Sequence, residues 1–306
     1  MAWGFLIAMY FFLAGTGAGA FLTAIVAEKY DRVAFRSLIR AGLILSGILV
    51  GLGMPFLIAD LGAGRTQPWR LILLIINPTS PMTWGVWVLM PFIPLALVLG
   101  WLEVDFLSPP WRIVAWARGL ALRWRTRLLQ VGALLAIAIA IYTGVLLGVV
   151  QAVPLWNTFV LPMLFFISAL STGLAACVVL SQVVAVRSVD AGVHPAKSHF
   201  YVNRIHLALI ITEVVFILCW LVIVASGSVT AARSVGMLLS GQYSVFFWIG
   251  IVLIGILGPM LIYTYEVVLR RPLKPAWVLI GDGSVLLGGL VLRYLVIAAA
   301  VPVILT

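Results

Sequence analysis

Long apolar runs, separated by short segments that carry the charges, dominate this chain of 306 residues. A helix needs about 20 apolar residues to cross about 30 Å of hydrocarbon. Transmembrane strands would instead give alternating segments of about ten residues, a pattern that the chain does not show. The pattern therefore predicts an all-α integral membrane protein with eight spanning helices, at residues 3–27, 38–61, 83–106, 128–150, 157–186, 205–226, 243–268 and 278–303.

The composition supports this class, because 64% of the residues are hydrophobic and only 9% are charged. The first run has no basic segment before it and is longer than the apolar part of a signal peptide, so we expect a retained span. The even number of spans suggests two four-helix bundles, residues 1–150 and 151–306. Glycines such as Gly15, Gly19 and Gly255 are expected to let helices pack closely in lipid.

The net charge of +10 is distributed unevenly between the predicted loops. Cytoplasmic loops carry an excess of Lys and Arg, so this distribution predicts that both termini face the outer side. It indicates topology and some affinity for anionic membrane lipid, and not nucleic-acid binding. Arg65, Arg70 and Arg233 lie on the predicted outer side and Arg293 within a span, whereas fifteen basic residues lie on the inner side: Lys29, Arg32, Arg36, Arg40, Arg112, Arg118, Arg123, Arg125, Arg127, Arg187, Lys197, Arg204, Arg270, Arg271 and Lys274.

Four polar side chains from four spans are expected at similar depths in the outer half of the membrane. With a rise of about 1.5 Å per residue, Tyr10, Tyr142 and Arg293 fall in this half, and Asp60 ends the second span at its boundary. Alternatively, the tyrosines belong to the interfacial aromatic belt and Asp60 caps its helix. A guanidinium inside a span needs partners. Above these groups lies the long outer loop that carries Arg65, Trp69, Arg70, Asn77 and Trp84.

A second polar set lies deeper or toward the inner side. Glu213 falls near mid-membrane in the sixth span, with His206 one heptad earlier on roughly the same helix face. The carboxylate of Glu213 is expected to be protonated, to pair with a cation such as Arg293, or to lie in a water-filled cavity. The set fits a proton path or a structural hydrogen bond between helices. The boundary carboxylates Glu103, Asp105, Glu266 and Asp282 are expected to be solvated or paired with loop arginines.

Several kinds of redox centre lack their ligands in this sequence. A bis-histidine haem needs two suitably placed histidines in spans, and only His206 is placed so. Cys177 and Cys219 lie in separate spans and form no metal-binding spacing, so no metal site is predicted. There is also no P-loop and no nucleophile elbow. Redox chemistry would therefore need an organic partner in the membrane and a metal carrier on another polypeptide.

Several motifs resemble the NrfD/PsrC family of polysulfide reductase membrane subunits. They are Asp60-Leu61-Gly62, Pro68-Trp69-Arg70, the run from Asn77 to Gly85 (NPTSPMTWG), Tyr10 before AGTGAGAFL, YTGVLL from Tyr142, and PLWN from Pro154. The resemblance covers the whole sequence. It implies a haem-free anchor in the inner membrane of a prokaryote. This anchor would exchange electrons between a membrane quinone, either menaquinone or ubiquinone, and a four-cluster ferredoxin-like iron–sulfur subunit on the outer face. That subunit would connect it to a catalytic subunit, typically a molybdopterin enzyme.

The resemblance also implies roles for single residues. Tyr10 matches a quinone-site histidine, Asp60 an acidic residue that ends the second span, and Tyr142 a quinone-site tyrosine. The family's DLGRP pattern is altered here to DLGAGRTQP. The walls and hydrogen-bonding groups of a lid over the quinone are expected from Trp69, Arg70, Asn77, Ser80 and Trp84. A rigid platform for the iron–sulfur partner is expected from Arg65, Pro78 and Pro81.

Two other functions remain open at this stage. An ion-translocating membrane protein would use Glu213, His206 and Arg293 as its pathway, although the paired broken helices of transporters are not evident. A passive anchor would only hold soluble subunits. Quinone exchange and proton movement could also occur in the same protein.

Overall fold

The computed structural model describes residues 4–60, 73–104, 112–185, 195–269 and 274–303, and within these ranges all regular structure is helical. Eight of the helical segments are long and apolar enough to cross a membrane, which confirms the predicted number of spans. The segments are α1 (Phe5–Asp31), α2 (Arg36–Asp60), α4 (Leu73–Ile76), α5 (Pro81–Leu102), α6 (Arg112–Gly148), α7 (Val160–Ala185), α8 (Pro195–Gly227), α9 (Val229–Leu239), η3 (Phe246–Leu257), α10 (Gly258–Leu269) and α11 (Pro275–Ala298).

Two features depart from the spans expected from sequence. The seventh span is a π-helix, η3, that continues directly as the α-helix α10. A short amphipathic helix, α9, follows α8 at its end, where the sequence pattern predicts a loop; the Ser228 hydroxyl caps it by accepting a hydrogen bond from the Ala231 amide at 3.2 Å. Caps of this kind satisfy an amide that has no partner within the helix.

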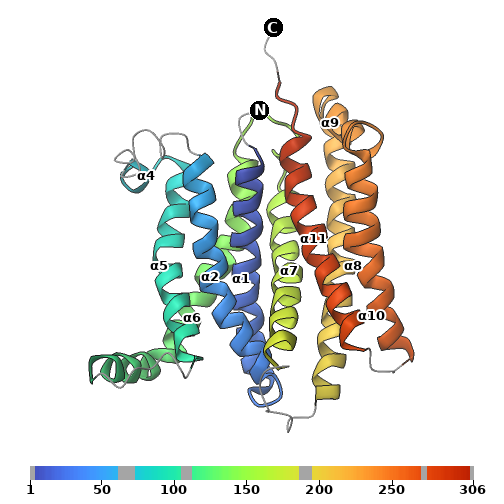
Figure 1. Ribbon diagram of the computed structural model, residues 1–306. Helices are drawn as coiled ribbons and strands as arrows, with labels where there is room; N and C mark the ends of the chain where they lie inside the picture. Colours follow the sequence, from blue (N-terminus) through green and yellow to red (C-terminus); the bar gives the residue numbers. More distant parts are fainter. Residues whose placement is uncertain (1–3, 61–72, 105–111, 186–194, 270–273, 304–306) are drawn as a thin grey trace.

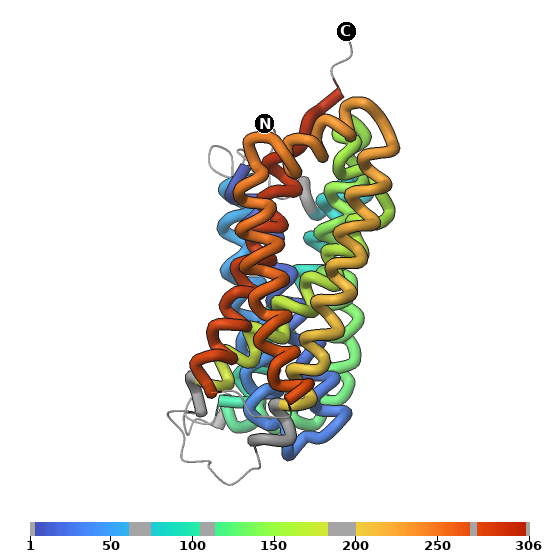
Figure 2. Tube along the Cα trace, turned by 90° about the vertical axis from the view of Figure 1, so that its right-hand side faces the viewer, coloured from blue at the N-terminus to red at the C-terminus, as the bar shows by residue number. Residues whose placement is uncertain are grey.

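All eight spans run between the same two ends of the molecule (Figures 1 and 2), and α1 begins at the end where α11 finishes. We call this end, which also carries the start of α5, the outer end, after the predicted sidedness. The opposite end, with the turn between α1 and α2, is the inner end. The sidedness and the division into two four-helix bundles stay predictions.

Helices α1 and α7 form the centre of the molecule, since each packs on four or more other elements. They approach so closely that a Cβ on Gly19 would lie 1.8 Å from the carbonyl oxygen of Ala169, and one on Gly173 would lie 2.2 Å from the carbonyl carbon of Gly19. Only glycine allows this distance between two backbones. The glycine-rich first span, residues 15–19, therefore acts as the expected helix-packing surface, and it joins residues 1–150 to residues 151–306.

Helix α6 has 37 residues, about 55 Å of helix, which exceeds the roughly 30 Å hydrocarbon core. Its first part turns away from the other helices and projects sideways at the inner end (Figure 1). Arg125 anchors this part of α6, because its guanidinium donates hydrogen bonds to Glu28 of α1 and, at 3.0 Å, to Glu103. The expectation that Glu103 pairs with a loop arginine is confirmed.

Candidate functional site

The turn before α5 is folded tightly on itself. The Asn77 side-chain oxygen accepts hydrogen bonds from the Thr79 amide at 3.3 Å and the Thr79 hydroxyl at 2.7 Å. The indole of Trp84 donates to the Pro78 carbonyl at 2.9 Å. Pro81 is the first residue of α5, where a proline costs the helix no hydrogen bond. The turn is thus held by its own side chains and enters α5 in a fixed direction.

Tyr142 of α6 lies directly under this turn. Its hydroxyl donates to the carbonyl of Pro81 at 3.1 Å. The ring lies flat against Gly85, where a Cβ would be 2.2 Å from the tyrosine Cζ. Gly85 is therefore the position of α5 that admits the ring. The hydroxyl hydrogen is committed to Pro81, and the phenol oxygen interacts with the Gly85 amide and keeps capacity to accept one more hydrogen bond.

Tyr10 of α1 meets Tyr142 at a small cavity beneath the turn. The cavity has a volume of about 20 Å³ and is also lined by Leu57, Met82 and Leu146. Tyr10 is 1% exposed and interacts electrostatically with Tyr142. A space of this size holds about one water molecule, or one oxygen of a larger molecule. Tyr10 and Tyr142, from different helices, thus both line one small space in the outer half of the bundle.

The other residues expected at the quinone site are distributed differently. Asn77 is exposed in the turn, Trp84 is exposed in the first turn of α5, Ser80 is half-buried directly before Pro81, and Asp60 is the last residue of α2. Trp69, Arg70 and the docking residue Arg65 lie outside the described residues. The side-chain oxygen of Asn77 is used to hold Thr79, and the role expected for Asn77 in the quinone site stays a prediction.

The guanidinium of Arg293 lies beside Gly15 of α1 and not at the cavity lined by the outer tyrosines. It is fully buried, and its Nη2 is the atom nearest to a Cβ built on Gly15, five residues below Tyr10 on α1. Its Nη1 donates to the Ser168 hydroxyl at 3.1 Å, and that hydroxyl also hydrogen-bonds Glu213. The ring of the next residue, Tyr294, lies 6.2 Å from that of Phe5 at the start of α1, so the α11 backbone has the expected outer level here and the arginine side chain extends inward from it. Of the three alternatives expected for Glu213, the contact with Arg293 is the one with described partners, and it runs through Ser168.

Aromatic rings complete the surroundings of Arg293. Its Cζ lies 5.9 Å from the ring centroid of Phe12 and 5.5 Å from that of Phe165. The Gly289 carbonyl accepts from Nη1 at 2.9 Å. Among the described residues Nε and Nη2 find no hydrogen-bond partner. Buried donors of this kind usually bind ordered water.

A second buried polar cluster was not expected from the sequence. Asp282 of α11 is fully buried, accepts a hydrogen bond from the Tyr263 hydroxyl at 2.6 Å, and has its Oδ1 3.1 Å from Nδ1 of His206. Neither ring nitrogen of His206 has a well-directed hydrogen bond in the described part of the sequence, so the contact with Asp282 is one of proximity. The solvated state expected for Asp282 is wrong.

Glu266 corrects the same expectation. It is 4% exposed and accepts a hydrogen bond from the side-chain amide of Asn203. Asp282 lies two turns after the start of α11. This distance from the loop was the sequence signal that could have placed Asp282 inside the membrane. For Asn203 and Tyr263 no comparable signal exists, because uncharged polar residues near span ends are common.

No group of three or more His, Cys, Asp or Glu side chains that could hold a metal ion occurs in the described ranges. The polar groups fall into two sets: the outer tyrosines beneath the turn, and a row of ionisable groups on α8, α10 and α11 that Ser168 of α7 joins. The residues of the second set all follow the start of α7 in the sequence.

Comparisons with known proteins agree with these features. Residues 1–304 match the model of the family described as polysulphide reductase, NrfD. The sequence is 30% identical to protein NrfD of Escherichia coli over 98% of its own length and 95% of that protein. It is 28% identical to the C subunit of the polysulfide reductase of Wolinella succinogenes, with 98% and 94% covered, and 29% identical to an NrfD homolog of Haemophilus influenzae, with 85% and 83% covered. The protein belongs to the NrfD/PsrC family of polysulfide reductase membrane subunits.

Proposed function

We propose that this protein is the haem-free membrane subunit of a respiratory oxidoreductase complex and that it exchanges electrons between membrane quinol and an iron–sulfur subunit on the outer face. The observation that supports this most is the meeting of Tyr10 and Tyr142 beneath the turn at the start of α5. Similarity to a subunit of polysulfide reductase supports the multisubunit character. The catalytic partner is then an oxidoreductase, and we propose that it is a molybdopterin enzyme.

The cavity suits one oxygen atom of a quinol, and not the ring. With its hydrogen donated to Pro81, Tyr142 offers an acceptor, which matches the hydroxyl of a quinol better than the carbonyl of a quinone. Tyr10 supplies a second hydroxyl at the same position. We propose that the ring itself lies outside this space, toward the turn and Trp84.

Oxidation of a quinol releases two protons with two electrons. A group near the ring must accept each proton and return it to water. Asp60, at the outer boundary of α2, is the carboxylate closest in sequence to the cavity-lining Leu57. We assign it the proton acceptor role, with Trp69, Arg70, Asn77 and Ser80 as surrounding groups and Arg65, Pro78 and Pro81 on the docking side.

Replacing Tyr142 by phenylalanine tests this site. The variant keeps the ring that fills the space at Gly85 and removes the acceptor oxygen. The loss of one hydrogen bond of about 0.5–1.5 kcal/mol predicts a fall in kcat/KM for quinol of about two- to thirteenfold in the assembled complex. Tyr243→Phe, in the turn between α9 and η3, is the matched control. Unchanged quinol-dependent turnover in a folded Tyr142→Phe complex would exclude the site.

A second function, proton movement across the membrane, is supported by the row of buried ionisable groups. From the inner end the row runs through Glu266 with Asn203, His206 with Asp282, and Glu213 with Ser168 and Arg293. We propose that water molecules bridge these steps, because His206 and Glu213 are seven residues apart, about 10 Å along α8. Unpartnered nitrogens on His206 and Arg293, within the described ranges, offer hydrogen bonds to such water.

Replacing Glu213 by glutamine separates the two functions. The side chain keeps its size and a hydrogen bond to Ser168 but loses its acid–base capacity. Normal quinol oxidation with lost proton uptake in proteoliposomes would support a separate path. Normal proton uptake would assign the Glu213–Ser168–Arg293 contact a structural role.

A further inference from the structure

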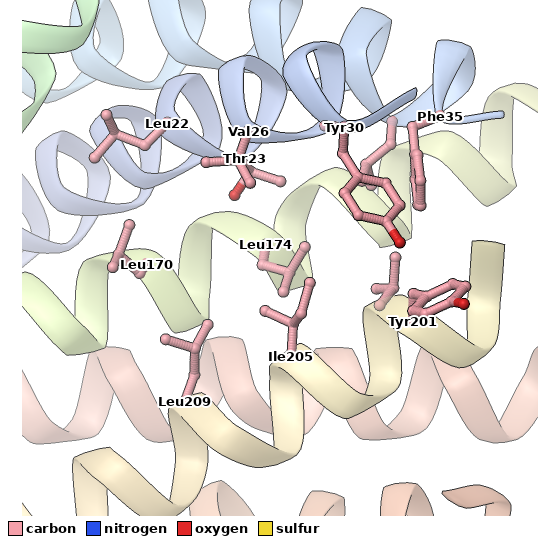
Figure 3. A pocket seen from close by; sticks show the side chains of 13 residues that line it. Leu22, Thr23, Val26, Tyr30, Phe35, Leu170, Leu174, Tyr201, Ile205 and Leu209 are labelled. Carbon is pink, nitrogen blue, oxygen red and sulfur yellow. The ribbon is translucent and has the colours of Figure 1, made fainter. Parts of the chain in front are cut away.

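An apolar groove at the inner end of the molecule is not used by either proposed function. It lies between α1 and α8, each of which packs on α7. Its volume is about 260 Å³. Figure 3 shows side chains from all three helices pointing into it, with Leu22, Leu170 and Leu209 at one end and Tyr30 and Tyr201 at the other.

The lining of the groove is almost entirely hydrocarbon. The polar side-chain atoms that it includes are the hydroxyls of Thr23, Tyr30 and Tyr201. The Thr23 hydroxyl is turned to its own helix and donates to the Gly19 carbonyl at 2.9 Å. A quinone ring or a peptide would leave its polar atoms without partners in such a lining, which is costly. The groove therefore suits an alkyl chain.

The dimensions of the groove fit one acyl chain. Leu22 and Tyr30 are eight residues apart on α1, as are Leu209 and Tyr201 on α8, so the groove extends about 12 Å along the helix axes. One leaflet contributes about half of the roughly 30 Å hydrocarbon core. The volume is also below the about 300–1,000 Å³ of pockets that enclose drug-sized ligands.

Tyrosines mark the end of the groove that meets the headgroup layer. The rings of Tyr30 and Tyr201 lie 5.9 Å apart between centroids, and both residues are exposed. Tyrosine is enriched at membrane interfaces, where its ring is in hydrocarbon and its hydroxyl in water. An acyl chain that entered between them would run from the inner boundary toward the centre of the membrane.

Positive charge surrounds this end. Lys29 precedes Tyr30, Arg36 follows the lining residue Phe35, and Arg204 precedes Ile205. In the part of the sequence that the structure describes, these three cations have no ion-pair partner. The other charged side chains nearby are engaged: Glu28 with Arg125 and, at 3.9 Å, with Arg32, and Asp31 with the amides of Val33 and Ala34 at 2.9 Å.

We propose that this groove binds one anionic phospholipid of the inner leaflet, with an acyl chain between α1, α7 and α8 and the phosphate beside Lys29, Arg36 and Arg204. An unfilled apolar space at this depth would cost stability, and an acyl chain here fills the space between α1 and α8. The lipid would hold α8 against the α1–α7 centre.

The test compares the lipids retained by the full-length protein, purified from its native membrane in mild detergent with the partners that it keeps. Native mass spectrometry and lipid extraction report the number and headgroup of bound lipids. Val26 lines the groove and is 61% exposed, so Val26→Trp fills the groove without entering the core. Val222→Trp is the matched control, on α8 away from the groove and 66% exposed.

We expect one tightly retained phosphatidylglycerol or cardiolipin, lost in Val26→Trp and kept in Val222→Trp. Each basic side chain near a membrane surface contributes about fivefold to binding an anionic lipid, so Arg36→Gln with Arg204→Gln is expected to weaken retention about thirtyfold. The paired control is Arg123→Gln with Arg233→Gln. Lipids in the proportions of the bulk membrane, equal loss in both tryptophan variants, or a quinone displaced by Val26→Trp would each overturn the proposal.

Discussion

Replacing Gly85 by alanine is expected to displace Tyr142 and with it the oxygen acceptor of the proposed quinol site. The added Cβ would lie 2.2 Å from the Tyr142 Cζ and 2.4 Å from its hydroxyl oxygen. Carbon atoms in contact are about 3.5–4.0 Å apart, so the ring must move by more than about 1 Å. The hydroxyl would then lose its 3.1 Å hydrogen bond to the Pro81 carbonyl.

The energetic cost has three contributions. Overpacking costs about 1–3 kcal/mol, and the lost hydrogen bond adds about 0.5–1.5 kcal/mol. Alanine regains about 1 kcal/mol of helix propensity relative to glycine. The net loss of stability is therefore about 0.5–3.5 kcal/mol, while the acceptor moves away from the cavity that Tyr10 also lines.

Two measurements test the reasoning: thermal unfolding in detergent and quinol-dependent turnover of the assembled complex. Turnover is expected to fall about tenfold or more, and adding Tyr142→Phe is expected to lower it little further, because both changes act on one group. Gly51→Ala is the matched control, since it lies in the interior of α2 with nothing within 4 Å of its Cβ. A folded Gly85→Ala complex with turnover equal to that of Gly51→Ala would refute the assignment.

Three further substitutions test the packing and the buried clusters. Gly19→Ala places a Cβ 1.8 Å from the Ala169 carbonyl oxygen. Because a backbone cannot rotate away, the free energy of unfolding in detergent is expected to fall by about 3 kcal/mol, the upper limit for overpacking. An unchanged unfolding temperature would contradict the α1–α7 contact. Arg125→Gln removes charged hydrogen bonds to two carboxylates and is expected to destabilise by about 1–3 kcal/mol, measured against Arg123→Gln. Asp282→Asn weakens the contacts with Tyr263 and His206, with an expected loss of about 1–3 kcal/mol, and an unchanged unfolding curve would show that the carboxylate does not hold the cluster.

The spans could be predicted from sequence because the bilayer imposes a single length and composition on every crossing. The runs that begin near residues 38 and 157, for example, correspond to α2 and α7 within a few residues. The first part of α6, residues 112–127, carries too many arginines to cross the membrane, and the predicted fourth span accordingly begins only at residue 128. The additional helix α9 was missed, since eleven residues are too few to give a spanning pattern.

Side-chain partners across helices were harder to predict than depth within one helix. Tyr10 and Tyr142 were correctly expected at one level, because each helix begins at a clear boundary. The partners of Arg293 could not be predicted in this way, since its side chain extends from α11 to Gly15 on α1 and Ser168 on α7. Asp282 was treated as a boundary charge because its distance from the loop was counted and its neighbours, His206 and Tyr263, were unknown.

The position of the polar groups on α11 has a consequence for how the protein is made. This helix is the last of the spans and the least apolar of the eight described, since it carries Asp282 and Arg293. A lone arginine at mid-helix costs about 2.5–3.5 kcal/mol to insert. Every partner described for these two side chains on other helices, including His206, Tyr263, Ser168 and Glu213, precedes them in the sequence. A growing polypeptide therefore delivers the two ionisable groups only after the helices that receive them are in the membrane, and truncation after α10 would leave Glu213 and His206 facing an empty position beside α7.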